Sequence, residues 1–303
     1  GQLMGSYSLG TAATPTVAVP TLTKSASISD ANATSDRINI SMTGVAHPAE
    51  GKAYEGWLVS DDGETKTSLG VLEVSGGSIS HEYISPTGED LIQSYDHIMI
   101  TVEAESGSGS TPSDDIAFSD TIPTDAITHI RTLVKGSMGA LRTQLDAAIA
   151  EATLAKDATT IADVVLHTNN AIALIDGDSG VLALADGVQT GADTASVAVI
   201  DQVVDSHAIL AYKYGKNAAD WATLAKGVAN DKVVNETDVT IAKLFSGPGS
   251  GTVLGYLSAA RNGFEATGGA EQAYVEAQLM ASYVLADRPT SSVVLPSVGD
   301  QAV

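Results

Sequence analysis

The stretch IAFSDTIPTDAITHIRTLVK, residues 116–135, changes its hydrophobic period at Pro123. On the N-terminal side of this proline, apolar and polar residues alternate, which is typical of a β-strand. On its C-terminal side, apolar residues recur at helical spacing, and Thr124 or Asp125 can cap a helix. The stretch therefore predicts a boundary between a β domain and an α domain.

Upstream of this boundary, from about residue 24 to 122, the sequence keeps a period of two. In DRINISMTGV, Ile38, Ile40 and Met42 alternate with polar residues. Similar runs are SASISD, AYEGWLVS, TSLGVLEVS, SISHEYIS, HIMITVEAE and IAFSDTI, which brings the count to about seven strands. Short strands with turn residues between them predict an antiparallel immunoglobulin-like β-sandwich over residues 24–122.

Downstream, residues 123–288 show helical periodicity. Residues 128–157 predict one long helix with glycines in its middle, and residues 158–177 predict a second that ends at Gly177. Residues 193–214 predict a third helix, residues 218–230 a shorter fourth and residues 237–246 a fifth, and two more are predicted between residues 251 and 285. Short loops between helices favour antiparallel neighbours, so we expect an all-α helical bundle. The predicted fold class is α+β with two domains and an extended segment at each end.

The chain is strongly acidic, with 37 acidic against 15 basic residues and a formal net charge of −22. Residues 1–122 carry 17 acidic and 4 basic residues, and residues 123–303 carry 20 and 11, so both halves share the excess. Such a surface repels nucleic-acid phosphates and anionic membranes. No run approaches the roughly 20 apolar residues of a membrane-spanning helix. We expect no nucleic-acid partner and no membrane insertion of this chain.

Cysteine is absent, which excludes disulfides, thiolate metal sites and cysteine nucleophiles. An acidic, cysteine-free chain rich in Thr, Ser, Gly and Ala is typical of exported bacterial or archaeal proteins, although some cytosolic proteins share this composition. Residue 1 is not Met, which fits the removal of a signal peptide and equally fits a trimmed sequence. We therefore expect an extracellular or cell-surface location after signal-peptide removal.

Part of the β half carries a pattern found in a known family. An aromatic residue precedes a Trp-Leu-Val strand, a Leu-Gly-x-Leu strand, a Thr-x-Glu strand and a Thr-Pro turn. The pattern is carried by Tyr54, Trp57, Leu58, Val59, Leu69, Gly70, Leu72, Ile100, Thr101, Val102, Glu103, Thr111 and Pro112. The region that contains them, about a quarter of the chain, resembles the extracytoplasmic domain of anti-sigma-K-type factors. The resemblance implies a β-sandwich outside the cytoplasm and no active site.

That family also has a cytoplasmic sigma-binding segment and a membrane helix. Neither is recognised in this sequence, so sigma-factor regulation is not carried over.

No catalytic signature accompanies this pattern. The sequence lacks a G-x-S-x-G elbow between a strand and a helix. Four glutamates alternate with apolar strand residues, which predicts a solvated sheet face rather than paired carboxylates in a cleft: Glu55, Glu73, Glu82 and Glu103. We expect a protein that is not an enzyme and needs no cofactor.

Three histidines offer an alternative chemistry. His129, His167 and His207 each lie on the apolar stripe of a different predicted helix, so they could together ligate a metal ion or haem. In the other interpretation each imidazole binds a backbone carbonyl or a nearby carboxylate such as Asp163 or Asp205. The second interpretation is favoured because no H-x-x-E-H or E-x-x-H spacing is present.

The extended ends suggest how the protein could assemble. Residues 1–23 include an uncharged, strand-like run between prolines, and residues 289–303 are also extended. Such a segment can pair with the edge of its own sheet or add to a neighbour's sheet, and the second arrangement propagates into a filament. The candidate assembly residues are Thr14, Thr16, Val17, Val19, Leu22, Val293, Val294 and Leu295.

These observations predict a non-enzymatic, exported structural protein whose partners are other copies of itself. It would form a filament, a pilus-like fibre or a surface layer by strand addition. The first alternative is a monomeric extracytoplasmic binding or sensory module. The second is a metal- or haem-binding helical bundle.

Overall fold

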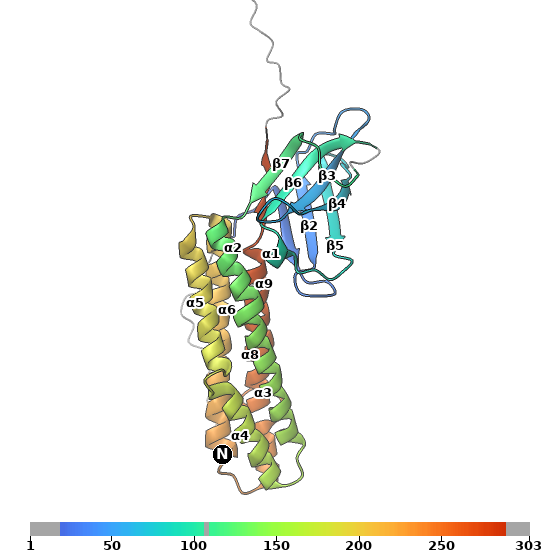
Figure 1. The fold of residues 1–303 in the computed structure, drawn as a ribbon. Coiled ribbons are helices and arrows are strands. Elements are labelled where there is room, and N and C mark those ends of the chain that lie inside the picture. Colours follow the sequence, from blue (N-terminus) through green and yellow to red (C-terminus); the bar gives the residue numbers. More distant parts are fainter. Residues whose placement is uncertain (1–18, 106–108, 289–303) are drawn as a thin grey trace, which may run out of the picture. The chain divides into compact units, whose positions relative to one another are not determined.

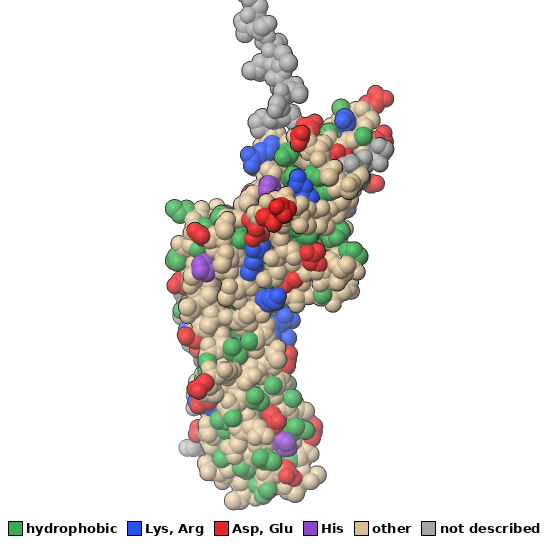
Figure 2. Space-filling view, in the orientation of Figure 1, with side chains coloured by type: hydrophobic (Ala, Val, Ile, Leu, Met, Phe, Trp, Pro, Cys, Tyr) green, Lys and Arg blue, Asp and Glu red, His purple; other side chains and the backbone are tan. Residues whose placement is uncertain are grey.

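The computed structural model describes residues 19–105 and 109–288, and the chain forms two compact units (Figure 1). We call the first the β unit; among the described residues it contains 21–105, 109–124 and 282–288. The second, the helical unit, contains Asp125–Ala281. The predicted α+β architecture in two parts is confirmed. Acidic side chains are spread over both units on the face that Figure 2 shows, as the charge count predicts.

The β unit holds two antiparallel sheets. The four-stranded sheet has the order β5-β2-β1-β8, with bounds Ser78–Ile84, Arg37–Thr43, Lys24–Ser29 and Tyr283–Val284. The five-stranded sheet has the order β4-β3-β6-β7-β9, with bounds Lys66–Leu72, Lys52–Val59, His97–Ala104, Ile116–Thr121 and Ala286–Asp287. A short helix, α1 (Leu91–Ser94), precedes β6.

The alternation that predicted these strands also buries their apolar face. Ile38 and Ile40 of β2 are buried, as are Ile98 and Ile100 of β6. The two sheets touch at Gly56 of β3, where a Cβ atom would lie 3.5 Å from Cδ1 of Ile40. A larger side chain at this position would push the sheets apart. An immunoglobulin-like sandwich remains a prediction, because only the two sheets and this contact between them are established.

The end of the helical region differs from the sequence-based expectation. The bundle was predicted to continue to residue 288, but the helical unit ends at Ala281 and the chain returns to the β unit. There β8 pairs with β1, with Tyr283 opposite Ala26, and β9 pairs with β7, with Asp287 opposite Phe118. Strands of two residues are too short to carry a periodic signal. Along the chain, the helical unit is therefore an insertion between β7 and β8.

The helical unit is a bundle of helical columns that lie side by side (Figure 1). The first column contains α2 (Thr124–Arg131), the π-helical segment η1 (Thr132–Met138) and α3 (Gly139–Asp157). The next contains α4 (Ile161–Asp176) and α5 (Val181–Ala198), and it is followed by α6 (Gln202–Val228) with the π-helical segment η2 (Ala229–Val233). The last contains α7 (Val239–Ser246), α8 (Val253–Asn262) and α9 (Ala270–Leu279). Within the described residues, no helix combines the length and apolar character needed to cross a membrane.

Small residues let the helices approach closely. The buried positions of α5 and α6 are largely alanine, and a Cβ atom at Gly215 of α6 would lie only 2.6 Å from Cγ1 of Val188. The sequence predicted a helix over residues 193–214 and a separate one over 218–230. In the structure the break comes earlier, because Asp201 accepts hydrogen bonds from the N–H groups of Val203 and Val204 and so begins α6. Gly215 lies inside this helix at its contact with α5.

Candidate functional site

A chain of hydrogen bonds joins three residues of the anti-sigma-type pattern. The indole Nε1–H of Trp57 on β3 donates to Oγ1 of Thr101 on β6, at 3.1 Å. The Thr101 hydroxyl in turn donates to Oε1 of Glu103, at 2.5 Å. The same carboxylate oxygen accepts the backbone N–H of Ser113 at 2.8 Å. We call Trp57, Thr101 and Glu103 the β-unit polar chain.

These side chains lie on the face of the five-stranded sheet opposite Gly56. Strand alternation places Glu55, Trp57 and Val59 on one face of β3, and the register sets Glu55 opposite Thr101 and Trp57 opposite Met99. Trp57, Val59 and Met99 form a buried cluster there, with Ile116 packed against it. This face is therefore apolar around its polar groups.

The predicted solvated glutamate face is wrong for two of its four members. Glu55 and Glu103 are each only 5% exposed. Each has a carboxylate oxygen that accepts hydrogen bonds: Ser68 Oγ donates to Oε1 of Glu55 at 2.6 Å, and Thr101 and Ser113 donate to Oε1 of Glu103. Strand alternation gives the face on which a residue lies, but not whether that face meets water.

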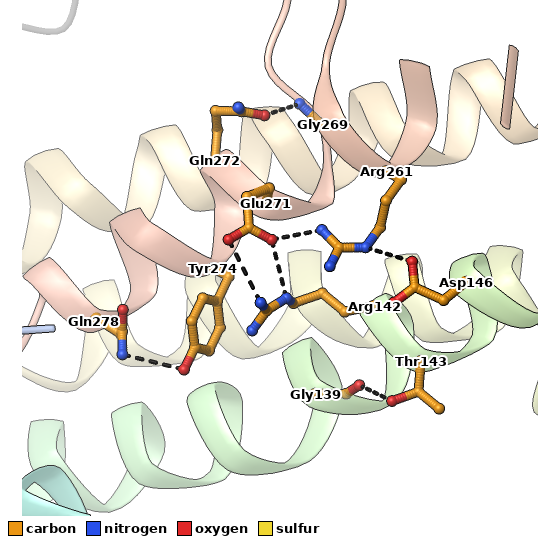
Figure 3. A network of polar contacts seen from close by, with 10 residues as sticks. All are labelled: Gly139, Arg142, Thr143, Asp146, Arg261, Gly269, Glu271, Gln272, Tyr274 and Gln278. Atoms are coloured by element: carbon orange, nitrogen blue, oxygen red, sulfur yellow. Dashed lines mark hydrogen bonds and ion pairs between the residues drawn. The ribbon is translucent and has the colours of Figure 1, made fainter. Parts of the chain in front are cut away.

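A network of charged side chains lies in the helical unit where α3, α8 and α9 meet (Figure 3). Glu271 of α9 accepts from two guanidinium groups at once. Its Oε2 lies 3.1 Å from Nε of Arg142 on α3 and 2.5 Å from Nη1 of Arg261 on α8. Arg261 Nε also donates to Asp146 of α3 at 2.9 Å. The guanidinium of Arg142 lies 4.1 Å from the centre of the Tyr274 ring.

We call Arg142, Asp146, Arg261 and Glu271 the bundle charge network. Each guanidinium is held by a carboxylate, and Arg142 also stacks on an aromatic ring, which is an arrangement that fixes orientation. No sequence pattern predicts this network, because two of its three pairs, Arg142–Glu271 and Arg261–Asp146, join residues more than a hundred positions apart. A local signal is the spacing of Arg142 and Asp146, which places them on one helix face.

The three histidines proposed as metal ligands are not brought together. Nδ1 of His167 on α4 lies 2.8 Å from Oε2 of Glu151 on α3, and Nδ1 of His207 on α6 lies 2.6 Å from Oε2 of Glu276 on α9. His129 is half-buried on α2. No three His, Asp or Glu side chains in the described part of the chain are grouped so that they could hold a metal ion. The pairing with single carboxylates follows the second interpretation, although the carboxylates come from neighbouring helices and not from Asp163 or Asp205.

Two of the candidate assembly residues can be located. Val19 is exposed and Leu22 is half-buried, and both precede the first residue of β1. The other six lie outside the described residues: Thr14, Thr16, Val17, Val293, Val294 and Leu295. The edges of β1 and β7, where an added strand could have paired, are occupied by β8 and β9 of the same chain.

Comparison with known proteins addresses the same β region. A family model described as anti-sigma-K factor rskA, C-terminal, matches residues 10–116. The resemblance of this region to anti-sigma-K factors is confirmed. The match includes the whole β-unit polar chain and ends at the first residue of β7, so it covers none of the helical unit. No curated protein and no solved structure matches the chain.

This match overturns the principal functional prediction. The family is one of anti-sigma factors, which are regulators and not fibre subunits. The predicted self-assembling filament, pilus-like fibre or surface layer is therefore wrong. The homopolymer partner and the extracellular or cell-surface location after signal-peptide removal are wrong for the same reason. The alternative of a binding or sensory module agrees better with the match.

Proposed function

We propose that this chain is a non-enzymatic binding or sensory module of an anti-sigma-type regulator. The observation that carries the proposal is the family match over residues 10–116, which includes β1 to β6 and the hydrogen-bonded residues Trp57, Thr101 and Glu103. By its family the regulated partner would be a sigma factor, and the output would be transcription.

The connections between the two units support a role in passing on a binding event. Only Ile122 and Pro123 separate β7 from α2, and only residues 280–282 separate α9 from β8. Both ends of the helical insertion therefore continue directly into strands of the family-type β unit. A change in the helical unit would act on two neighbouring parts of the β unit without a long linker to absorb it.

The absence of catalysis is also part of the proposal. The buried carboxylates of Glu55 and Glu103 accept hydrogen bonds from their neighbours, and His167 and His207 are each paired with one glutamate. Groups held in this way support packing and orientation rather than proton transfer to a substrate.

Deletion of the gene in the organism that carries it would test this proposal. We expect a set of transcripts that share one promoter sequence to change in abundance, and the intact gene supplied in trans to restore them. An unchanged transcriptome under growth and stress conditions would contradict the regulatory role. Light scattering on the purified chain distinguishes a binding module from a polymer, because we expect a binding module to have a single, discrete molar mass.

A further inference from the structure

A shallow groove of about 420 Å³ lies where α7 passes the end of α3. Its size falls in the range of about 300–1,000 Å³ that is typical of small-molecule sites. It is lined by Lys156, Thr240, Ile241, Lys243, Leu244, Gly247 and Pro248. We call it the α7 groove.

The apolar part of the groove comes from one side of α7. Ile241 is 43% exposed and Leu244 is 69% exposed, while Ala242 and Ser246 on the same helix are buried in the bundle. Single exposed apolar side chains are common, but two at a spacing of three residues that line one hollow form an apolar strip. Pro248 lines the same hollow.

The charged part of the groove consists of two lysines. The stem of Lys156 passes Gly247, with Cγ 3.9 Å from the position of a Cβ atom there. Lys156 pairs with the adjacent Asp157, whereas Lys243 forms no ion pair with any described residue. Asp238, the nearest acid before α7, is not among the lining residues and accepts from the N–H groups of Thr240 and Ile241.

We infer that the α7 groove binds a single-chain anionic amphiphile, such as a medium-chain carboxylate. The acyl chain lies along Ile241, Leu244 and Pro248, and the headgroup meets Lys243 and Lys156. In a chain with 37 acidic and 15 basic residues, a groove whose charged lining is only lysine is suited to a negative headgroup. The inference rests on the proposed function of a binding module and names the class of ligand.

Isothermal titration of the full chain with sodium dodecanoate, below its micellar concentration, tests this inference. We expect saturable binding at a single site, and no comparable binding of dodecyltrimethylammonium or neutral octyl glucoside. Lys243→Glu and Leu244→Ser should each weaken dodecanoate binding roughly five- to tenfold, through lost charge and lost apolar contact. Lys135→Glu and Leu166→Ser, at exposed positions on other helices, are the matched controls and should leave it unchanged.

The inference would be overturned by no saturable binding, by equal binding of all three amphiphiles, or by dodecanoate binding that Lys243→Glu and Leu244→Ser leave intact. Binding to phosphatidylglycerol vesicles without binding of monomeric dodecanoate would also overturn it, in favour of a membrane surface. The regulatory proposal is tested independently, because the transcript changes on gene deletion do not depend on dodecanoate. Failure of the titration alone would leave that proposal standing.

Discussion

Thr101 is the residue through which the polar groups of the five-stranded sheet are joined. Its hydroxyl accepts from the Trp57 indole and donates to the Glu103 carboxylate, and its side chain is fully buried. Only a group that can both donate and accept can occupy this position between an N–H donor and a carboxyl oxygen that accepts. The Thr-x-Glu spacing seen in the sequence therefore has a physical reason within the fold.

We expect Thr101→Val to lower the free energy of unfolding of the β unit by about 1–3 kcal/mol, because the indole N–H and the carboxylate both lose a buried partner. The chain has two tryptophans, Trp57 and Trp221, one in each unit. In a Trp221→Phe background, urea unfolding followed by fluorescence reports on the β unit alone. Thr121→Val, at an exposed position of β7, is the control and should change little. A loss of stability no larger than that of the control would contradict the role of Thr101 in the β-unit polar chain.

Asp36 fastens the turn between β1 and β2. Its buried carboxylate accepts the backbone N–H groups of Ala31, Asn32 and Ala33, at 2.7, 3.1 and 2.9 Å. Burial by itself would raise the pKa of Asp36, but these hydrogen bonds together outweigh it and hold the pKa below the ordinary value of 3.8. The folded state therefore favours the ionised form.

The sign of the pH dependence follows from this lowered pKa. The stabilisation is present above the unfolded-state pKa and is lost as the pH falls through the lower folded-state pKa. We expect Asp36→Asn to cost about 1–3 kcal/mol at neutral pH, because charged hydrogen bonds are replaced by weaker ones. The difference from the unaltered chain should shrink below about pH 4. Urea unfolding at a series of pH values measures it, and a difference independent of pH would refute the assignment.

At the scale of elements, one carboxylate of α9 forms ion pairs with arginines on two other helices of the bundle. Glu271 binds Arg142 of α3 and Arg261 of α8, and its side chain is about one-third exposed. Solvent screens such a group, so its removal costs less than that of a fully buried pair. The remaining cost comes from leaving two guanidinium groups close together.

We expect Glu271→Ala to destabilise the helical unit by about 1–2 kcal/mol. Thermal or urea unfolding followed by circular dichroism at a helical wavelength would show it. Asp186→Ala, on the exposed face of α5, removes an equal charge and should have little effect. If both substitutions change stability equally, the effect belongs to net charge and not to the bundle charge network.

At the scale of the whole molecule, the chain leaves the β unit after β7 and returns to it at β8. The returning residues pair first with β1 and then with β7, and the Lys24–Asp287 ion pair at 2.6 Å and the hydrogen bond from Val284 N–H to Asp120 at 2.6 Å add to this pairing. They also cover two sheet edges that would otherwise be open to another chain. The β unit is therefore completed only after the helical unit has been synthesised.

We expect Tyr283→Ala to lower the stability of the β unit by about 3–5 kcal/mol, as for other large buried aromatic side chains. Val284→Ala, at the next and partly exposed position of β8, should cost much less. Fluorescence of Trp57 in the Trp221→Phe background again isolates this unit, and hydrogen exchange at Ala26 reports on the pairing with β8. Equal and small effects of the two substitutions would show that β8 is dispensable.

The sequence by itself determined the elements whose signals are local. Alternation over residues 24–122 gave the strands, the change at Pro123 gave the start of the helices, and the Trp-Leu-Val and Thr-x-Glu spacing gave the family resemblance. These features depend on residues a few positions apart, so they can be recognised in the sequence without knowledge of the fold.

Only the tertiary structure decided which of those surfaces meet water and which distant residues meet each other. It buried Glu55 and Glu103, paired His167 and His207 each with a different glutamate, and joined Arg142 to Glu271. It also returned Tyr283 to the first strand of the β unit. Burial and pairing of this kind depend on contacts between residues far apart in the chain. Such contacts leave no periodic pattern in the sequence. They stabilise the fold only when the elements pack together and exclude water.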